Sequence, residues 1–189
     1  NIRYIVSTFI AAVAFGYIAI FKVKIGYSRI DRIIAFIDPL GNLEDEGWQL
    51  SQSLAAVSNG SFLGSGLGMS KQKFLYLSQA HNDFIFAIIC EEFGFLGALV
   101  LIIAYFAFLV FGIRIAMKTK YTYSRLLVSG ILFVIGIQAY VNMTVVTGLI
   151  PPTGLTLPFI SYGGTSLMIM LALVGIILNV DRNNEEERQ

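Results

Sequence analysis

Histidine and cysteine are nearly absent from this chain of 189 residues, which contains one of each, His81 and Cys90. A single cysteine excludes an internal disulfide and a cysteine-rich metal site. The lone histidine lacks the partners of a metal site or a catalytic triad, so we expect His81 to orient or cap neighbouring groups. Charged residues are also scarce, at 13% with a formal net charge of +1, which excludes nucleic-acid binding driven by bulk electrostatics.

Hydrophobic residues, in contrast, make up 56% of the chain, and the mean hydropathy is +0.74. A helix needs about 20 residues to cross a bilayer, and four apolar blocks are long enough: 4–21, 84–113, 126–149 and 161–180. The first block lacks a small-residue cleavage site, so we expect a span rather than a signal peptide. The sequence therefore predicts an all-α polytopic membrane helix bundle with one long connection, 22–82.

The connection between the second and third predicted spans gives the orientation. It carries no acid and four basic residues: Arg114, Lys118, Lys120 and Arg125. Because basic residues in short loops stay in the cytoplasm, this connection is predicted to be cytoplasmic, as is the C-terminal tail 181–189. The long loop 22–82 and the proline-rich turn 151–158 then face outward.

The long outer loop contains two short amphipathic patterns and a glycine-rich stretch. Residues 27–37 and 48–58 have apolar side chains at helical spacing. Four glycines then precede two lysines: Gly60, Gly64, Gly66 and Gly68, followed by Lys71 and Lys73. The spacing fits neither a P-loop nor a dinucleotide fingerprint. Two interpretations stay open, an outward-facing site for an anionic headgroup or pyrophosphate and a structural loop.

The junction at 80–94 places acids where a polar loop turns into an apolar helix. Asn82 can cap this helix, and Asp83 in its first turn would be favoured by the free amides and the helix dipole. Residues 93–113 already supply about 30 Å of helix, the hydrocarbon thickness. If the helix is continuous, Glu92 lies at the outer boundary and Asp83 about 14 Å further out at 1.5 Å per residue. Asp83 would then form the floor of an outer pocket covered by the long loop.

Glu91 and Glu92 point about 100° apart on a helix, so they cannot face one partner. We expect a structural role for at least one of them, pairing with a basic residue of 29–32 or capping backbone amides. Further along, the prolines and glycines of 147–166 break helix at membrane depth, where irregular backbone is tolerated only against protein or a wet cavity. This segment either lines the same outer cavity or locks helices together.

Four motifs resemble one family. They are Asn-Asp-Phe-Ile-Phe-Ala at 82–87, Glu-Glu-Phe-Gly at 91–94, Gly-Leu-Ile-Pro at 148–151 and Gly-Leu-Thr-Leu-Pro-Phe-Ile-Ser-Tyr-Gly-Gly at 154–164. Together they look like the C-terminal half of the SEDS (shape, elongation, division, sporulation) proteins, and Gly-Leu-Thr-Leu-Pro is closer to the FtsW/SpoVE branch than to RodA. The resemblance covers nearly the whole chain, which would hold the last four of about ten spans.

The resemblance implies a peptidoglycan glycosyltransferase that polymerises lipid II into a growing glycan strand at the outer face of the bacterial inner membrane. It implies as partners membrane lipids, a class B penicillin-binding protein and divisome-type proteins. Asp83 matches the family's essential aspartate, and its implied role is general base on the attacking sugar hydroxyl; a divalent cation, Mg²⁺ or Mn²⁺, can assist. Candidates for substrate contact are Gln52, Lys71, Lys73, His81, Ser161, Tyr162, Gly163 and Gly164.

The chain departs from the family at 78–79, Ser-Gln in place of Pro-Glu, and at Asn82, where threonine is common. Two other functions remain compatible with broken helices and acids at a membrane: a lipid II flippase or transporter, and an inactive scaffold for the penicillin-binding protein.

Overall fold

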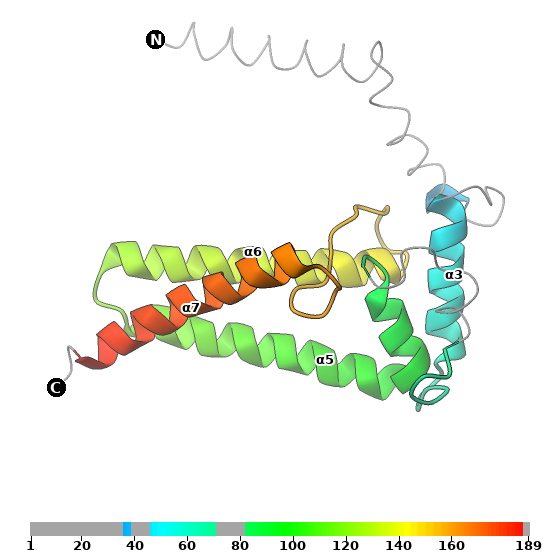
Figure 1. Ribbon diagram of the computed structural model, residues 1–189, viewed down its shortest axis with the longest axis horizontal. Helices are drawn as coiled ribbons and strands as arrows, with labels where there is room; N and C mark the ends of the chain where they lie inside the picture. The colour runs from blue at the N-terminus through cyan, green and yellow to red at the C-terminus, as the bar shows by residue number, and fades with distance from the viewer. Residues whose placement is uncertain (1–35, 39–45, 71–81, 187–189) are drawn as a thin grey trace, which may run out of the picture.

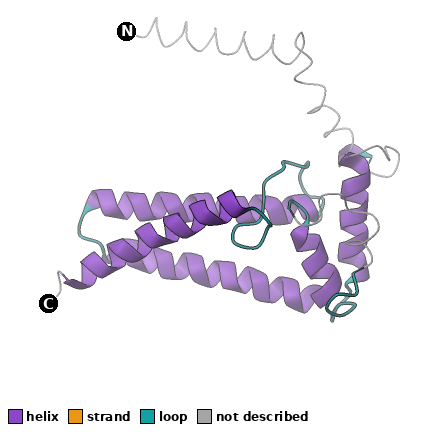
Figure 2. Ribbon diagram, viewed as in Figure 1, coloured by secondary structure: helices purple, strands orange, loops and turns teal. Residues whose placement is uncertain are grey.

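The computed structural model describes residues 36–38, 46–70 and 82–186. Its elements are α3 (Glu46–Asn59), α5 (Ile85–Lys118), α6 (Thr122–Val146) and α7 (Gly164–Glu186). No strand occurs among the described residues (Figure 2), which confirms the predicted all-α class. The predicted span 4–21 and most of the predicted helix 27–37 lie outside the described part of the chain.

Three of the described helices, α5, α6 and α7, are long and apolar enough to cross a membrane. Helices α5 and α6 run side by side, joined by a short connection after Lys118, and α7 lies across them (Figure 1). Gly112 allows the close approach of α6, because a Cβ there would lie 2.3 Å from a methyl carbon of Leu132. Large apolar side chains such as Phe106 and Phe133 are exposed on the outside, as expected for a lipid-facing or helix-facing surface.

Helix α7 continues through Glu186, so the first residues of the predicted cytoplasmic tail 181–189 are helical; the side of the membrane on which the tail lies stays a prediction. Asn184 is buried and its Nδ2 donates to Thr119 Oγ1 at 2.9 Å, in the connection between α5 and α6. This bond ties the C-terminal part of α7 to the connection between α5 and α6.

The prediction of a continuous helix from Phe84 to Ile113 is also wrong. Helix α5 breaks at Gly94, whose φ of 65° and ψ of −161° are far from helical values. The turns before Gly94 swing away from the long part of α5 toward the C-terminal end of α6 (Figure 1). Asp83 therefore does not stand beyond the bilayer on the axis of α5, and it is brought back beside α6 instead.

The glycine-rich loop supplies new partners for the helical hydrogen bonds that the break at Gly94 removes. In an unbroken helix the amides of Phe95 and Leu96 would donate to the carbonyls of Glu91 and Glu92, four residues back. Instead they donate to the carbonyls of residues 61 and 62, at 3.0 and 3.3 Å, while the amides of residues 65 and 66 donate to the Glu91 and Glu92 carbonyls, at 2.9 and 3.1 Å. The two donors and the two acceptors of the lost helical hydrogen bonds thus all have new partners. The loop amides serve protein carbonyls, which favours the structural interpretation of the glycines over an anion site.

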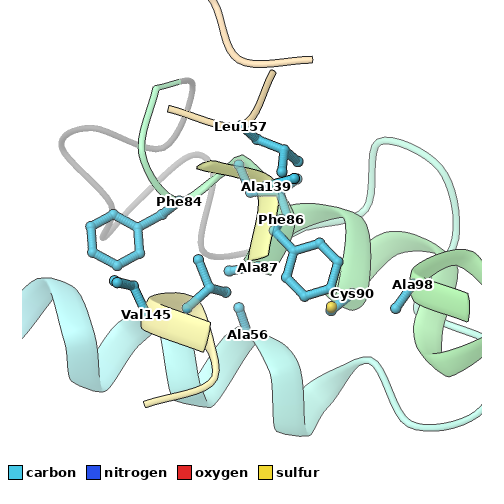
Figure 3. Close-up of a cluster of buried hydrophobic side chains, with 11 residues drawn as sticks. Ala56, Phe84, Phe86, Ala87, Cys90, Ala98, Ala139, Val145 and Leu157 are labelled. Carbon is cyan, nitrogen blue, oxygen red and sulfur yellow. The ribbon is translucent and has the colours of Figure 1, made fainter. Parts of the chain in front are cut away.

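Helix α3 closes this end of the bundle. Its buried Ser53 donates from Oγ to the Val146 carbonyl at 3.0 Å, at the last turn of α6. Ala56, one turn further, is fully buried in a core with the first turns of α5 (Figure 3). At Gly60 a Cβ would lie 1.8 Å from the Cys90 carbonyl oxygen, so only glycine allows this approach. Small residues on one face therefore bring α3 against both α5 and α6.

Candidate functional site

Asp83 lies in the turn at 82–84 that precedes α5. The N-cap of α5 is Phe84, which makes no side-chain cap hydrogen bond, and no acid occupies the first helical turn. The expectation that Asn82 caps the helix, with Asp83 in its first turn, is therefore wrong. The cause is the Phe84 side chain, which is 3% exposed and packs in the core with Val145 (Figure 3), so the helix starts two residues later than the polar pattern indicates.

Two polar side chains hold the backbone of this turn. Nδ2 of Asn142 donates both to the Asp83 carbonyl, at 2.8 Å, and to the Leu155 carbonyl, at 2.6 Å. Ser161 Oγ donates to the Asn82 carbonyl at 2.6 Å and accepts from the Leu157 amide at 2.7 Å. Asn142 is 1% exposed, so its amide is fixed by packing as well as by these bonds. The turn that carries Asp83 is thus joined to both α6 and the segment after it.

The segment 147–163 is itself held in an irregular path by the helices beneath it. Gln138 Nε2 donates to the Thr156 carbonyl at 3.0 Å, and the Tyr105 hydroxyl donates to the Pro158 carbonyl. Phe159 has a φ of 66°, a costly value for a side chain of this size, and its ring packs edge-on against Phe108. Side chains of α5 and α6 therefore satisfy backbone carbonyls of this non-helical segment, as a segment predicted to lie at membrane depth requires.

A cavity of about 60 Å³ opens beside Asp83. Its lining comes from α3, the turn before α5, the end of α6 and the segment after α6: Gln49, Asp83, Phe84, Val145, Pro152, Thr153, Gly154 and Leu155. A Cβ on Gly154 would lie 3.8 Å from Oδ2 of Asp83, so the glycine leaves room in front of the carboxylate. Residues 152–155 line the cavity while Ser161 locks the segment, so both roles left open for 147–166 are present.

The remaining predicted site residues have different outcomes. Lys71, Lys73 and His81 lie outside the described residues. Ser161 is brought to the Asp83 turn through the Asn82 carbonyl. Gln52, Tyr162, Gly163 and Gly164 do not line the cavity, and Tyr162 is 81% exposed. Their role in substrate binding stays a prediction.

Sequence reasoning passed over Gln49 and did not assign Asn142 to the site. Gln49 stands four and seven residues before Ser53 and Ala56, which places it on the same small-residue face of α3. The spacing of Gln49, Ser53 and Ala56 indicates this face of α3, whereas the larger side chains Leu50, Leu54 and Val57 define another face.

Glu91 and Glu92 are both buried, at 2% and 8% exposure. Ser70 donates its hydroxyl proton to Oε2 of Glu91, and Oε1 of Glu92 meets no donor among the described residues. The Ser70 contact ties the end of the glycine-rich loop to α5, whereas the basic residues 29–32, the predicted partners, lie outside the described residues.

Metal-binding capacity is limited in the part of the chain that the structure describes. No group of three or more His, Cys, Asp and Glu side chains gathers there. Asp83 is the only acid among the described residues that line the cavity, and Gln49 and Thr153 share its lining. Such a set suits Mg²⁺, which one or two carboxylates hold together with substrate phosphates, and does not suit a structural metal site.

The site and the fold define a class. This is a multi-pass helical membrane protein with one carboxylate in a small cavity, at the end of the bundle opposite the basic connection between α5 and α6 (Figure 1). The sequence model of the FtsW/RodA/SpoVE family, described as cell cycle proteins, matches residues 1–186. The chain belongs to this family.

Curated relatives agree with this assignment. The chain is 48% identical over 154 residues to the stage V sporulation protein E of Bacillus subtilis, covering 82% of this chain and 42% of that protein. It is 46% identical over 152 residues to a probable peptidoglycan glycosyltransferase FtsW of Geobacter sp. strain M18, covering 80% of this chain and 41% of the relative. The chain thus spans less than half the length of these relatives.

Solved structures show the same fold. One, described as a peptidoglycan synthase complex that coordinates polymerization and crosslinking, matches 96% of this chain and 49% of its own with a TM-score of 0.70 and 29% identity. A mutant of the rod shape determining protein RodA of Thermus thermophilus matches 56% of this chain and 36% of its own, with a TM-score of 0.53 and 39% identity. The chain therefore shares its fold with part of these solved structures.

Proposed function

We propose that the protein containing this chain is a peptidoglycan glycosyltransferase that polymerises lipid II at the outer face of the bacterial inner membrane, in cell division or sporulation. The observation that carries the proposal is the placement of Asp83: its carboxylate lines a cavity, and the backbone of its turn is bonded to two other elements. Relatives named as probable peptidoglycan glycosyltransferases support the reaction class.

In the proposed reaction the Asp83 carboxylate takes the proton from a hydroxyl of the acceptor sugar. The hydroxyl oxygen then forms the new glycosidic bond to the anomeric carbon of the donor sugar, and the bond from that carbon to the polyprenyl pyrophosphate breaks, with its electron pair leaving on the pyrophosphate. A general base must lie within hydrogen-bond reach of the proton that it removes. The cavity that Asp83 lines gives a hydroxyl that access.

A divalent cation is part of the proposal. Asp83 would hold it, and the cation would neutralise the charge on the leaving pyrophosphate. The oxygen atoms of the cavity fit this arrangement because Mg²⁺ takes most of its other ligands from water and phosphate.

The proposed partner is a class B penicillin-binding protein, with divisome-type proteins beside it. The likeness to a structure described as a peptidoglycan synthase complex supports it. The proposed orientation puts the C-terminus of α7 in the cytoplasm, because Arg114, Lys118, Lys120 and Arg125 gather at that end of the bundle.

One assay separates this function from its competitors. The full-length protein, purified with its partner, is given labelled lipid II in detergent with no membrane gradient. We expect glycan strands to form. Transfer of lipid II across liposome bilayers without polymer would establish a flippase instead, and partner binding without either activity would establish a scaffold.

Asn142 gives a test of the positioning of the base. Asn142→Leu keeps the branched shape of the side chain but leaves the Asp83 and Leu155 carbonyls without their donor, so the turn can shift. Because a misplacement of about 1 Å can cost 10²-fold in rate, we expect kcat to fall by about one to two orders of magnitude. Initial rates of polymerisation measure this. Gln138→Leu, which removes a bond only to Thr156, should lower the melting temperature with a smaller loss of kcat; an equal loss in both variants would contradict the positioning role of Asn142.

A further inference from the structure

Gln49 is a polar side chain that the fold places at the cavity without using it structurally. It lines the cavity together with Asp83, and its amide forms no hydrogen bond with any residue that the structure describes. The other side-chain amides near the site are engaged, since Asn142 and Gln138 each donate to backbone carbonyls of the segment after α6. The Gln49 amide is therefore available to bind a ligand in the cavity.

The position of Gln49 is fixed by the contacts of α3. Ser53, one turn later on the same face, is fully buried and bonded to the last turn of α6, and Leu54 packs on Gly148. Gln49 lies one turn before this contact, beside the irregular segment 147–155 that follows the end of α6. The face of α3 that packs on α6 thus extends beyond the C-terminal end of α6. At that point the Gln49 amide faces the cavity.

The size and chemistry of the cavity indicate which substrate group it receives. About 60 Å³ is far below the 300 Å³ or more of an ordinary small-molecule pocket, so one edge of a sugar can enter but not a whole ring or a pyrophosphate. None of the lining residues that the structure describes is basic, whereas a carboxylate and an amide with both a donor and an acceptor suit a hydroxyl or an acetamido group.

We propose that Gln49 binds the acceptor sugar by hydrogen bonds from its side-chain amide and so presents the attacking hydroxyl to Asp83. This inference rests on the proposed glycosyltransferase function and adds a substrate-contacting residue to it. The amide acts on binding and orientation and takes no proton.

The experiment uses the full-length protein with its partner and labelled lipid II, and compares Gln49→Ala with the parent and with Asn59→Ala. Asn59 is an exposed amide at the far end of α3, so its replacement controls for the helix. Losing one hydrogen bond to substrate should raise KM for lipid II by about 5- to 10-fold in Gln49→Ala. Asn59→Ala should keep the parent KM.

A second variant, Gln49→Glu, is tested by the pH profile of kcat/KM, which would not change if Gln49 had only a structural role. Among the described residues that line the cavity, Asp83 is the only titratable side chain. A second carboxylate there makes ionisation of Asp83 harder, so the acid limb of the pH profile of kcat/KM should move to higher pH by about one unit.

The outcomes separate this inference from the function on which it rests. If the parent makes glycan and Asp83→Asn does not, while Gln49→Ala keeps the parent KM and Gln49→Glu keeps the parent pH profile, the role of Gln49 is overturned and the function stands. A lower kcat and melting temperature with unchanged KM would also overturn it, by assigning Gln49 to structure. If the parent makes no glycan at all, the proposed function fails first.

Discussion

Asp83→Asn should reduce polymerisation of lipid II by about 10²- to 10⁴-fold, the usual contribution of a general base. Asparagine keeps the size of the side chain and can still hydrogen-bond a sugar hydroxyl, but it cannot accept the proton. The backbone contacts of the turn, from Asn142 to the Asp83 carbonyl and from Ser161 to the Asn82 carbonyl, do not involve the carboxylate. The fold and the substrate affinity should therefore survive, and the loss should appear in kcat.

The measurement is the single-turnover rate of glycan formation by the full-length protein with its partner. Asp181→Asn is the matched control, because Asp181 is an acid on α7 that does not line the cavity. We expect that variant to polymerise at the parent rate. Polymerisation by Asp83→Asn at the parent rate would show that another group is the base, even if the protein proves to be a glycosyltransferase.

Local patterns were sufficient to predict the helices and the candidate acid. Apolar blocks long enough to span a bilayer are a property of the sequence itself, and α5, α6 and α7 occupy three of them. The isolation of Asp83 between a polar loop and an apolar helix, and the helix-breaking residues of 147–166, both indicated a cavity on one side of the membrane. These inferences needed only hydrophobicity, helix length and backbone chemistry.

The arrangement around Asp83 could not be predicted in the same way, because it depends on contacts between distant residues. A single glycine in an apolar helix is tolerated without a break, so Gly94 gave no sign that α5 bends there. The break becomes possible only because residues 61–66 supply the missing hydrogen-bond partners, some 30 positions earlier in the chain. For Gln49, the spacing from Ser53 and Ala56 indicates its face of α3 but not the cavity, which forms only where Ser53 meets the Val146 carbonyl.

Gly64→Ala should unfold this end of the bundle. A Cβ at Gly64 would lie 2.1 Å from the Glu92 carbonyl oxygen and 2.7 Å from the Gly94 amide nitrogen, and these backbone atoms cannot move aside. The φ of +81° adds about 1 kcal/mol for any residue with a side chain. If the loop detaches, the four hydrogen bonds between 61–66 and 91–96 are lost, at about 1 kcal/mol each in net stability. We expect a total loss of about 4 kcal/mol or more.

Gly68→Ala provides the control within the same loop. Gly68 has a similar φ of +79°, but a Cβ there would meet nothing within 4 Å. It should therefore cost only the conformational term, about 1 kcal/mol. Thermal unfolding of the full-length protein in detergent compares the two variants. Because Asp83 reaches α6 only through the bend at Gly94, Gly64→Ala should lose polymerisation together with stability. Equal melting temperatures for the two variants would show that the loop does not clamp the broken helix.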